Sequence, residues 1–198
     1  MDKSYPIPMP VLPAGVRLDQ NVYVTMRDGI RISVDIYSPE AEGRYPALFS
    51  TSPYLKGIQT YAPEMTHSIE TGATFFFVQH GYVHIIAQSR GSGLSQGQYN
   101  WYDKEEQQDG SELVEWIARQ PWCSGNVGML GDSYYGRIQW LIAGLQPPHL
   151  KCIAPYDASM DDYRSRHDGG LIFEGFMSRW GADVIYQCMW PGPVEGKL

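Results

Sequence analysis

The stretch Gly128-Met129-Leu130-Gly131-Asp132-Ser133-Tyr134-Tyr135-Gly136 decides the fold, because it joins two kinds of structure through one serine. Val127 to Leu130 is a short apolar run, and Ser133 to Leu145 carries apolar residues at helical spacing. A sharp turn from a buried strand into a helix exposes a serine hydroxyl beside free N–H groups and the positive end of the helix dipole, where an oxyanion is stabilised. The pattern predicts Ser133 as a nucleophile; the alternative is an ordinary loop in which Ser133 caps the helix.

Glycines flank this serine on both sides. Gly131 precedes Ser133 by two residues and Gly136 follows it by three, so Tyr135 stands where a strict G-x-S-x-G motif has its last glycine. Side chains beside such a turn would collide with the neighbouring strand and helix. We therefore expect close packing at both glycines.

Four short, mostly apolar runs predict the strands of a parallel sheet: Ala47 to Ser50, Tyr82 to Gln88, Val127 to Leu130 and Cys152 to Ala154. Continuous apolar strands are typical of a sheet that helices cover on both faces. Helical spacing lies between them, at Asp103 to Arg119 and at Ser133 to Leu145, and prolines follow both segments. The order of these elements predicts a doubly wound α/β sheet.

An antiparallel hairpin is predicted before the parallel strands. Asn21 to Thr25 and Ile30 to Tyr37 alternate apolar and polar residues, and Arg27-Asp28-Gly29 between them is a strong turn signal. One face of the second strand is mostly polar, and we expect it to meet solvent: Arg31, Ser33, Asp35 and Tyr37. Prolines punctuate residues 1–20, which we expect to form an irregular lead-in.

Composition and charge exclude several classes of function. The 198 residues include 15 basic and 22 acidic side chains, a net charge of −7, and no basic cluster of the kind that binds nucleic acid. The longest apolar runs, Ala73 to Val78 and Val83 to Ala87, fall far below the roughly 18 residues that cross a bilayer. The N-terminus lacks the apolar core of a secretory signal, so we expect a cytoplasmic protein.

The cysteines are Cys123, Cys152 and Cys188, an odd number with no C-x-x-C pair. We therefore expect neither a disulfide scaffold nor a structural zinc site. Each cysteine is expected to be a small buried residue or a bystander.

Further motifs accompany the serine turn. They are Met26-Arg27-Asp28-Gly29, Tyr45-Pro46, Ser52-Pro53-Tyr54, Arg90-Gly91-Ser92-Gly93-Leu94-Ser95-Gln96-Gly97, Asp109-Gly110, Glu115-Trp116-Ile117, Gln120-Pro121-Trp122 and Pro147-Pro148-His149-Leu150. In this order and spacing, from about Val22 to about Gly170, the chain resembles the X-Pro dipeptidyl-peptidase, cocaine esterase and α-amino acid ester hydrolase family of CocE/NonD hydrolases. The family's nucleophile motif, G-x-S-Y-x-G, is matched residue by residue: Gly131, Ser133, Tyr134 and Gly136.

This resemblance implies a Ser-His-Asp hydrolase on an α/β-hydrolase sheet with a helical cap. Ser133 would attack an ester or amide carbonyl, and the backbone N–H of Tyr134 and the phenol of Tyr54 would hold the oxyanion. Without the resemblance, Tyr54 would be taken as a loop aromatic that caps the sheet edge. The implied partners are small ester or X-Pro-type peptide substrates, with no cofactor and no metal.

The resemblance also divides the chain into the lead-in (1–20), an α/β-hydrolase core (21–155) and the beginning of a helical cap (156–198). In the family the acid and the base lie beyond the cap, so no residue of this chain carries over to either position. We expect the chain to be truncated, with both groups downstream. A sheet without its last strands would have an open edge, and we expect marginal stability and self-association through it.

Several local side chains could in principle replace the base or the acid: Asp157, His67, His80, His84 and the pair His167-Asp168. We expect structural or surface roles for all of them. Asp161, Asp162 and Glu174 fit no cation-binding loop, and we expect them on a solvated helix start. His149 is expected to complement the negative end of the preceding helix.

Two alternatives to a serine hydrolase remain. The first is a catalytically silent fragment or pseudoenzyme of the same family, because the acid and base are absent. The second is a nucleotide-binding module, but Gln96 replaces the third glycine of a phosphate loop after Gly91-Ser92-Gly93 and no helix opens there. Ser89 stands where relatives commonly carry Asp, a change for which the sequence offers no physical reason.

Overall fold

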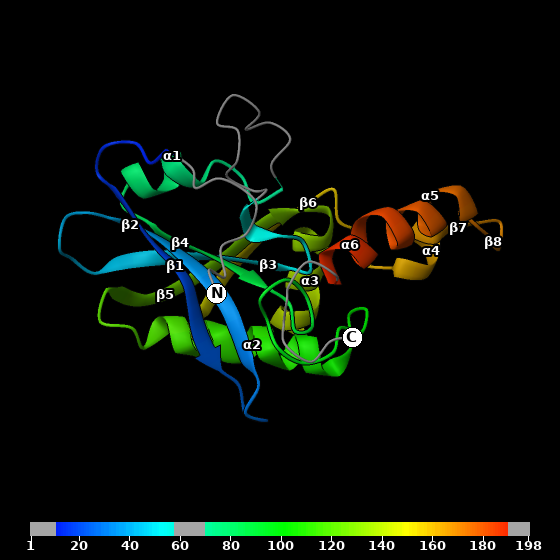
Figure 1. Cartoon of the computed structure of the whole chain (residues 1–198), viewed down its shortest axis with the longest axis horizontal. Coiled ribbons are helices and arrows are strands. Elements are labelled where there is room, and N and C mark those ends of the chain that lie inside the picture. Colours follow the sequence, from blue (N-terminus) through cyan, green and yellow to red (C-terminus); the bar gives the residue numbers. More distant parts are fainter. Residues whose placement is uncertain (1–10, 58–69, 190–198) are drawn as a thin grey trace, which may run out of the picture.

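The structure is a computed structural model and describes residues 11–57 and 70–189. In these ranges six strands form one mixed sheet in the order β1-β2-β4-β3-β5-β6 (Figure 1). β2 pairs antiparallel with both β1 and β4, whereas β4, β3, β5 and β6 run parallel. The strands are β1 (Val16–Thr25), β2 (Arg31–Pro39), β3 (Tyr45–Ser52), β4 (Val83–Gln88), β5 (Cys123–Asp132) and β6 (Leu150–Tyr156).

Helices cover both faces of this sheet: α1 (Thr74–Gln79), α2 (Lys104–Ala118) and α3 (Ser133–Gly144). Ile85 of β4 packs in the cluster that also holds Leu113 of α2 and Ile138 of α3. The next residue, Ile86, packs with Val78 of α1. Because successive strand residues point to opposite faces, α2 and α3 lie on one face and α1 on the other (Figure 1).

The predicted hairpin, parallel strands and two main helices are all confirmed. Asp103 caps α2 by accepting a hydrogen bond from the backbone N–H of Glu106 at 2.8 Å, as expected for a helix that starts there. β1 begins at Val16, earlier than the predicted start at Asn21, so the irregular lead-in is shorter than residues 1–20. The pairing of β1 shifts register between Asp19 and Val22.

The prediction of a solvent-facing polar face on the hairpin was wrong. Ser33, Asp35 and Tyr37 are all buried, although Arg31 is exposed. Lys56, from the loop after β3, reaches the Asp35 carboxylate at 2.9 Å and the Ser33 hydroxyl at 2.7 Å. Tyr37 packs under α1. Partners from distant parts of the chain therefore cover a face whose composition alone predicted exposure.

β6 also departs from the prediction, since its side chains are half-buried or exposed and not covered on both faces. The reason is its position at the edge of the described sheet, with β5 as its one neighbour there. Cys152 on β6 is exposed, whereas Cys123 and Cys188 are buried, and all three are free thiols.

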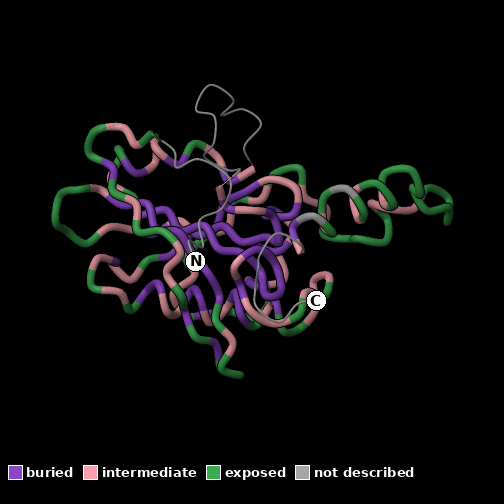
Figure 2. Tube along the Cα trace, in the orientation of Figure 1, coloured by how far each residue is buried: buried purple, intermediate pink, exposed green. Residues whose placement is uncertain are grey.

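Beyond β6 the described chain forms an arm of short elements that projects from the body (Figure 1). They are α4 (Asp162–Arg166), β7 (His167–Asp168), β8 (Leu171–Ile172), α5 (Glu174–Arg179), the π-helical turn η3 (Trp180–Ile185) and α6 (Tyr186–Met189). Most of the arm is exposed (Figure 2). None of the helices in the described ranges has the length and apolarity needed to span a membrane.

Candidate active site

Ser133 lies at the junction of β5 and α3, where the strand passes into the helix without a loop. Its backbone has φ of +55°, a left-handed conformation that is uncommon for residues other than glycine. Such a kink turns the chain sharply from strand to helix and leaves the Ser133 side chain at the carboxyl edge of the sheet. Asp132, in extended backbone, is the N-cap residue of α3.

The two flanking glycines sit where no other side chain fits. A Cβ on Gly131 would lie 2.4 Å from the Cβ of Tyr135. A Cβ on Gly136 would lie 2.6 Å from the Cβ of Ala158 and 2.9 Å from the carbonyl oxygens of Gly131 and Tyr156. The expectation of close packing at both glycines is confirmed, and it lets α3 begin directly against β5 and β6.

Tyr54 reaches the same edge from the neighbouring strand. β3 pairs parallel with β5, so the loop after Ser52 and the turn at Ser133 emerge side by side. The hydroxyl of Ser52 accepts a hydrogen bond from the N–H of Tyr54 at 3.0 Å and fixes the start of that loop. The Tyr54 ring is buried and meets the rings of Tyr134 and Tyr135 edge-on, with centroids 5.9 and 6.0 Å away.

Ser133 and Tyr54 line one small cavity of about 40 Å³ together with the start of α3 and part of the arm. Trp180, the first residue of η3, donates a hydrogen bond from its indole N–H to the Tyr54 hydroxyl at 2.9 Å. Since the indole occupies an acceptor site of that hydroxyl, the phenol proton is directed elsewhere. Burial raises the pKa of Tyr54, which keeps the phenol protonated as a donor.

The backbone N–H of Tyr134 belongs to the first turn of α3, where N–H groups have no intrahelical acceptor. The Tyr134 ring is buried and its hydroxyl bonds the buried carboxylate of Glu106. The structure thus brings together all three residues predicted for the site: Ser133, Tyr54 and Tyr134. This arrangement can present a hydroxyl nucleophile beside two hydrogen-bond donors, which is the chemistry of acyl transfer.

Acidic side chains stand on the other flank of the turn. Asp132 precedes Ser133, and its backbone N–H donates to the carbonyl oxygen of Glu70 at 2.8 Å. Burial, with the charges of Asp132 and Asp157, raises the pKa of Glu70 to about 7. Burial and the charge of Asp157 also raise the pKa of Asp132. Burial therefore favours the protonated, uncharged form of both carboxyls on this flank of the turn.

Each of the described histidines bonds a group other than Ser133. His84 is fully buried between the hydroxyls of Ser50 and Thr74, and burial lowers its pKa to about 3. The Nδ1 atoms of His80 and His167 lie 2.7 and 2.9 Å from backbone carbonyl oxygens in their own segments. Their predicted structural or surface roles are confirmed, and His67 lies outside the described residues.

Two other sequence predictions concern His149 and the aspartates Asp161 and Asp162. His149 lies 2.8 Å from the carboxylate of Glu115 on α2, so its partner is a side chain and not the end of α3. Asp161 caps α4, and Asp162 in its first turn pairs with Arg166 and with Arg137 of α3. Both aspartates stand at a solvated helix start as expected, and no cluster of metal-ligating side chains occurs within residues 11–57 and 70–189.

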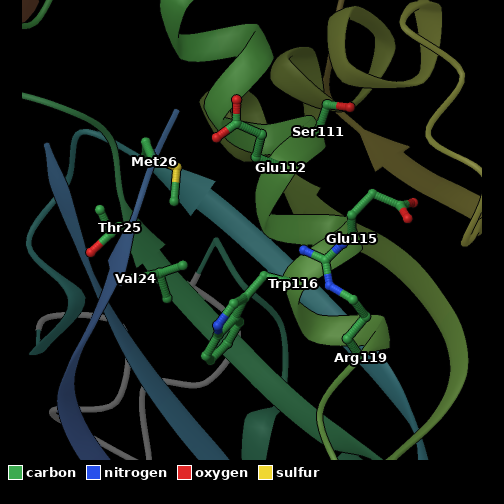
Figure 3. Close-up of a pocket in the computed structure, with 8 residues that line it drawn as sticks. All are labelled: Val24, Thr25, Met26, Ser111, Glu112, Glu115, Trp116 and Arg119. Atoms are coloured by element: carbon green, nitrogen blue, oxygen red, sulfur yellow. The ribbon is translucent and has the colours of Figure 1, made fainter. Parts of the chain in front are cut away.

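A larger hollow of about 420 Å³ opens elsewhere, between the end of β1 and α2 (Figure 3). Its lining combines apolar side chains, such as Met26 and Trp116, with charged ones, such as Glu112 and Arg119. None of the eight lining residues comes from the serine turn or the Tyr54 loop. The smaller cavity, which Ser133 and Tyr54 line, is therefore the candidate active site.

Sequence reasoning missed two residues of the site, Trp180 and Glu106. Trp180 lies in an irregular part of the chain, and a π-helical turn leaves no periodic signal, although such turns are frequent at functional sites. Glu106 does have a sequence signal, but a misleading one. Asp103-x-x-Glu106 is typical of a helix N-terminus and predicts capping alone.

Comparisons with known proteins show which family this chain resembles. A family model described as X-Pro dipeptidyl-peptidase (S15 family) matches residues 28–193. Cocaine esterase from Rhodococcus sp. is 40% identical over 165 residues, which cover 82% of this chain and 28% of that protein. A putative Xaa-Pro dipeptidyl-peptidase from Bacillus cereus is 27% identical over 195 residues, covering 80% of this chain and 33% of the relative.

Solved structures show the same fold. A CocE/NonD family hydrolase from Staphylococcus aureus superposes with a TM-score of 0.80 at 27% identity, covering 96% of this chain and 40% of that one. An α-amino acid ester hydrolase shares the fold with a TM-score of 0.64 and 24% identity, over 78% of this chain and 27% of that one. The chain spans 28% to 33% of the length of the two relatives above.

Proposed function

The chain belongs to the X-Pro dipeptidyl-peptidase (S15) family, and from that membership we propose that it carries the nucleophile and the oxyanion hole of a serine hydrolase. The family consists of esterase and peptidase hydrolases. The substrate class we propose is an acyl ester or an X-Pro-type peptide. One observation carries the proposal: Ser133, in left-handed backbone at the first residue of α3, shares a cavity with Tyr54.

In this mechanism the Ser133 hydroxyl oxygen attacks the substrate carbonyl carbon while a general base takes its proton. The oxyanion of the tetrahedral intermediate accepts hydrogen bonds from the Tyr134 N–H and the Tyr54 hydroxyl. Collapse of the intermediate breaks the bond to the leaving alcohol or amine, which receives the proton from the base. Water then releases the acyl group from Ser133 by the same steps.

The base and its orienting acid are proposed to be a histidine and an aspartate outside the described residues. Each described histidine has another hydrogen-bond partner, and none bonds Ser133. The alternative is a catalytically silent protein. It is favoured by the same absence of a histidine at Ser133 among the described residues.

Labelling with a fluorophosphonate tests the proposal. In the full-length protein as it is encoded, we expect one adduct by intact mass, located at Ser133, and hydrolysis of 4-nitrophenyl acetate or an alanyl-prolyl anilide. Ser133→Ala should abolish both, and hydrolysis that survives this substitution would contradict the assignment. Ser165→Ala, on the arm, is the matched control and should change neither.

The 198-residue chain on its own separates the two alternatives. A silent protein predicts no turnover above the background that an oxyanion hole alone provides. Turnover that depends on Ser133 in this chain would exclude the silent alternative.

A further inference from the structure

A carboxylate is buried directly behind the turn that carries Ser133. Glu106 is 3% exposed and accepts hydrogen bonds from the Ser89 hydroxyl at 2.5 Å, the Tyr134 hydroxyl at 2.8 and 2.9 Å, and the Tyr102 N–H at 3.1 Å. No basic side chain in the described ranges pairs with it. A buried carboxylate without a cation is costly, so burial raises the pKa of Glu106, and these three donors oppose that rise by stabilising the charged form.

The backbone of α2 fixes where this carboxylate lies. Glu106 is in the first turn of the helix, and its N–H donates to the capping carboxylate of Asp103 at 2.8 Å. The N-terminal end of a helix favours negative charge. In a capping box the glutamate would fold back onto the N–H of the cap residue. Here it accepts from the preceding N–H, of Tyr102, and extends to Tyr134.

Hydrogen bonds and ring stacking together fix the position of the Tyr134 side chain. Its hydroxyl has one hydrogen, which is shared between the two oxygens of Glu106, and it accepts a hydrogen bond from the Tyr99 hydroxyl at 2.9 Å. Its ring stacks on Tyr102 with centroids 4.3 Å apart and planes 23° apart. Since Tyr134 follows Ser133 directly, fixing this ring fixes the backbone N–H beside the nucleophile.

Ser89 now has a physical role. An aspartate at that position would set a second carboxylate against Glu106, at a point where the serine supplies a donor 2.5 Å away. Two carboxylates at that distance cannot both be ionised. Ser89 instead donates a hydrogen bond that favours the ionised form of Glu106, in which both oxygens can accept from Tyr134.

We propose that Glu106 is a positioning residue for the oxyanion hole: through the Tyr134 hydroxyl it fixes the backbone N–H that receives charge from the substrate. It acts on the reaction only through Tyr134 and does not touch the reacting atoms. This inference rests on the proposed function of Ser133.

The test compares Glu106→Gln and Tyr134→Phe in the full-length protein. In Glu106→Gln the amide keeps the shape of the carboxylate, but one acceptor oxygen becomes an NH2 donor that faces the other donors. Tyr134→Phe removes only the hydroxyl. For each variant we expect kcat to fall about tenfold or more with KM within about twofold of wild type. We expect the double variant to fall no further than the worse single variant, because both break one link.

Two controls separate positioning from general damage. Glu105→Gln makes the same chemical change one residue earlier, at a half-exposed carboxylate paired with Arg27, and should leave kcat unchanged. A boronic acid that mimics the tetrahedral intermediate should bind Glu106→Gln more weakly by the factor lost in kcat/KM, while a ground-state amide inhibitor binds as to wild type. Lost packing alone would not produce that selective effect.

The results that would exclude the positioning role of Glu106 differ from those that would exclude the proposed function of Ser133. The positioning role is excluded if Tyr134→Phe, or a folded Glu106→Gln variant, keeps kcat and boronate affinity within twofold of wild type. It is also excluded if only KM rises. In both cases hydrolysis would still depend on Ser133. If Glu106→Gln does not fold, Tyr134→Phe decides. Hydrolysis that survives Ser133→Ala removes the proposed function, and the inference with it.

Discussion

At the scale of single residues, the site depends on a backbone that tolerates few substitutions. The left-handed conformation at Ser133 costs on the order of 1–3 kcal/mol and persists only because its surroundings enforce it. Gly131 and Gly136 provide that enforcement, since their missing side chains let α3 press against β5 and β6. The same helix ends in a third glycine, Gly144, with open space around it.

Gly136→Ala should destabilise the protein by about 1–3 kcal/mol, because the new Cβ meets backbone carbonyls at 2.9 Å that cannot move independently. It should also lower the rate of fluorophosphonate labelling at Ser133. Gly144→Ala in the same helix is the control, and it should be neutral or stabilise by up to about 1 kcal/mol. Urea unfolding measures both, and equal effects would contradict the packing argument.

At the scale of elements, the loop that carries Tyr54 is anchored to the hairpin β1–β2. The ammonium of Lys56 is 1% exposed and lies within 2.9 Å of Asp35, Ser33 and the side-chain oxygen of Asn21. Asn21 lies at the register shift of β1 with φ of +55°. Burial lowers the pKa of Lys56, and the charge of Asp35 opposes that shift.

Lys56→Met should therefore cost about 3–5 kcal/mol, because it leaves the Asp35 charge buried without its partner. Lys56→Met combined with Asp35→Asn should recover part of the loss, since the amide oxygen can still accept from the Asn21 N–H. A double-mutant cycle by urea unfolding checks this expectation. Simple additivity of the two losses would show that the pair is not coupled.

The helices and strands could be predicted from the sequence, but the burial of their faces could be predicted only in part. Periodicity located α2, α3 and the parallel strands, because local sequence patterns specify helix and strand. The buried face of β2 was missed because Lys56 and α1 cover it from other parts of the chain. The exposure of β6 depends on its edge position, which is a property of the whole sheet.

The site was predictable to the same extent. The serine turn predicts Ser133 from its own pattern, whereas Tyr54 and Tyr134 were nominated through the family resemblance. Trp180 and Glu106 act through side-chain hydrogen bonds across distant segments. Such contacts have no local signal, and the one pattern at Glu106 indicated a helix cap.

Trp180→Phe tests the contact between the arm and the Tyr54 loop. Removing the indole N–H leaves the Tyr54 hydroxyl free to rotate, and the loss of one neutral hydrogen bond should lower kcat about 2- to 12-fold. In a Tyr54→Phe background the same substitution should have no further effect on kcat. An equal loss in both backgrounds would assign Trp180 to substrate packing and not to the hydroxyl.

At the scale of the whole molecule, burial raises the pKa of two carboxyls in the described part of the acidic chain, Glu70 and Glu106, to about 7. The nearby charge of Asp103 adds to the shift at Glu106. A folded pKa above the ordinary value of 4.5 means that the protonated form is favoured in the fold. The corresponding stability is fully present below about pH 4.5 and is lost as the pH rises through about 7.

The free energy of unfolding should therefore depend on pH. Relative to Glu106→Gln, the wild-type protein should lose on the order of 3 kcal/mol between pH 4.5 and pH 8. Urea titrations at several pH values measure the difference, and a wild-type curve parallel to that of Glu106→Gln would contradict a raised pKa at this site.

The Lys56 anchor has a consequence for genetics. It ties the phenol opposite Ser133 to the two opening strands, which are remote from that serine along the polypeptide. Random mutagenesis screened for lost turnover would therefore recover alleles in those strands as well as at the serine. Such alleles would resemble ordinary folding defects, yet second substitutions that remove the Lys56 charge should partly restore those that lose the Asp35 carboxylate.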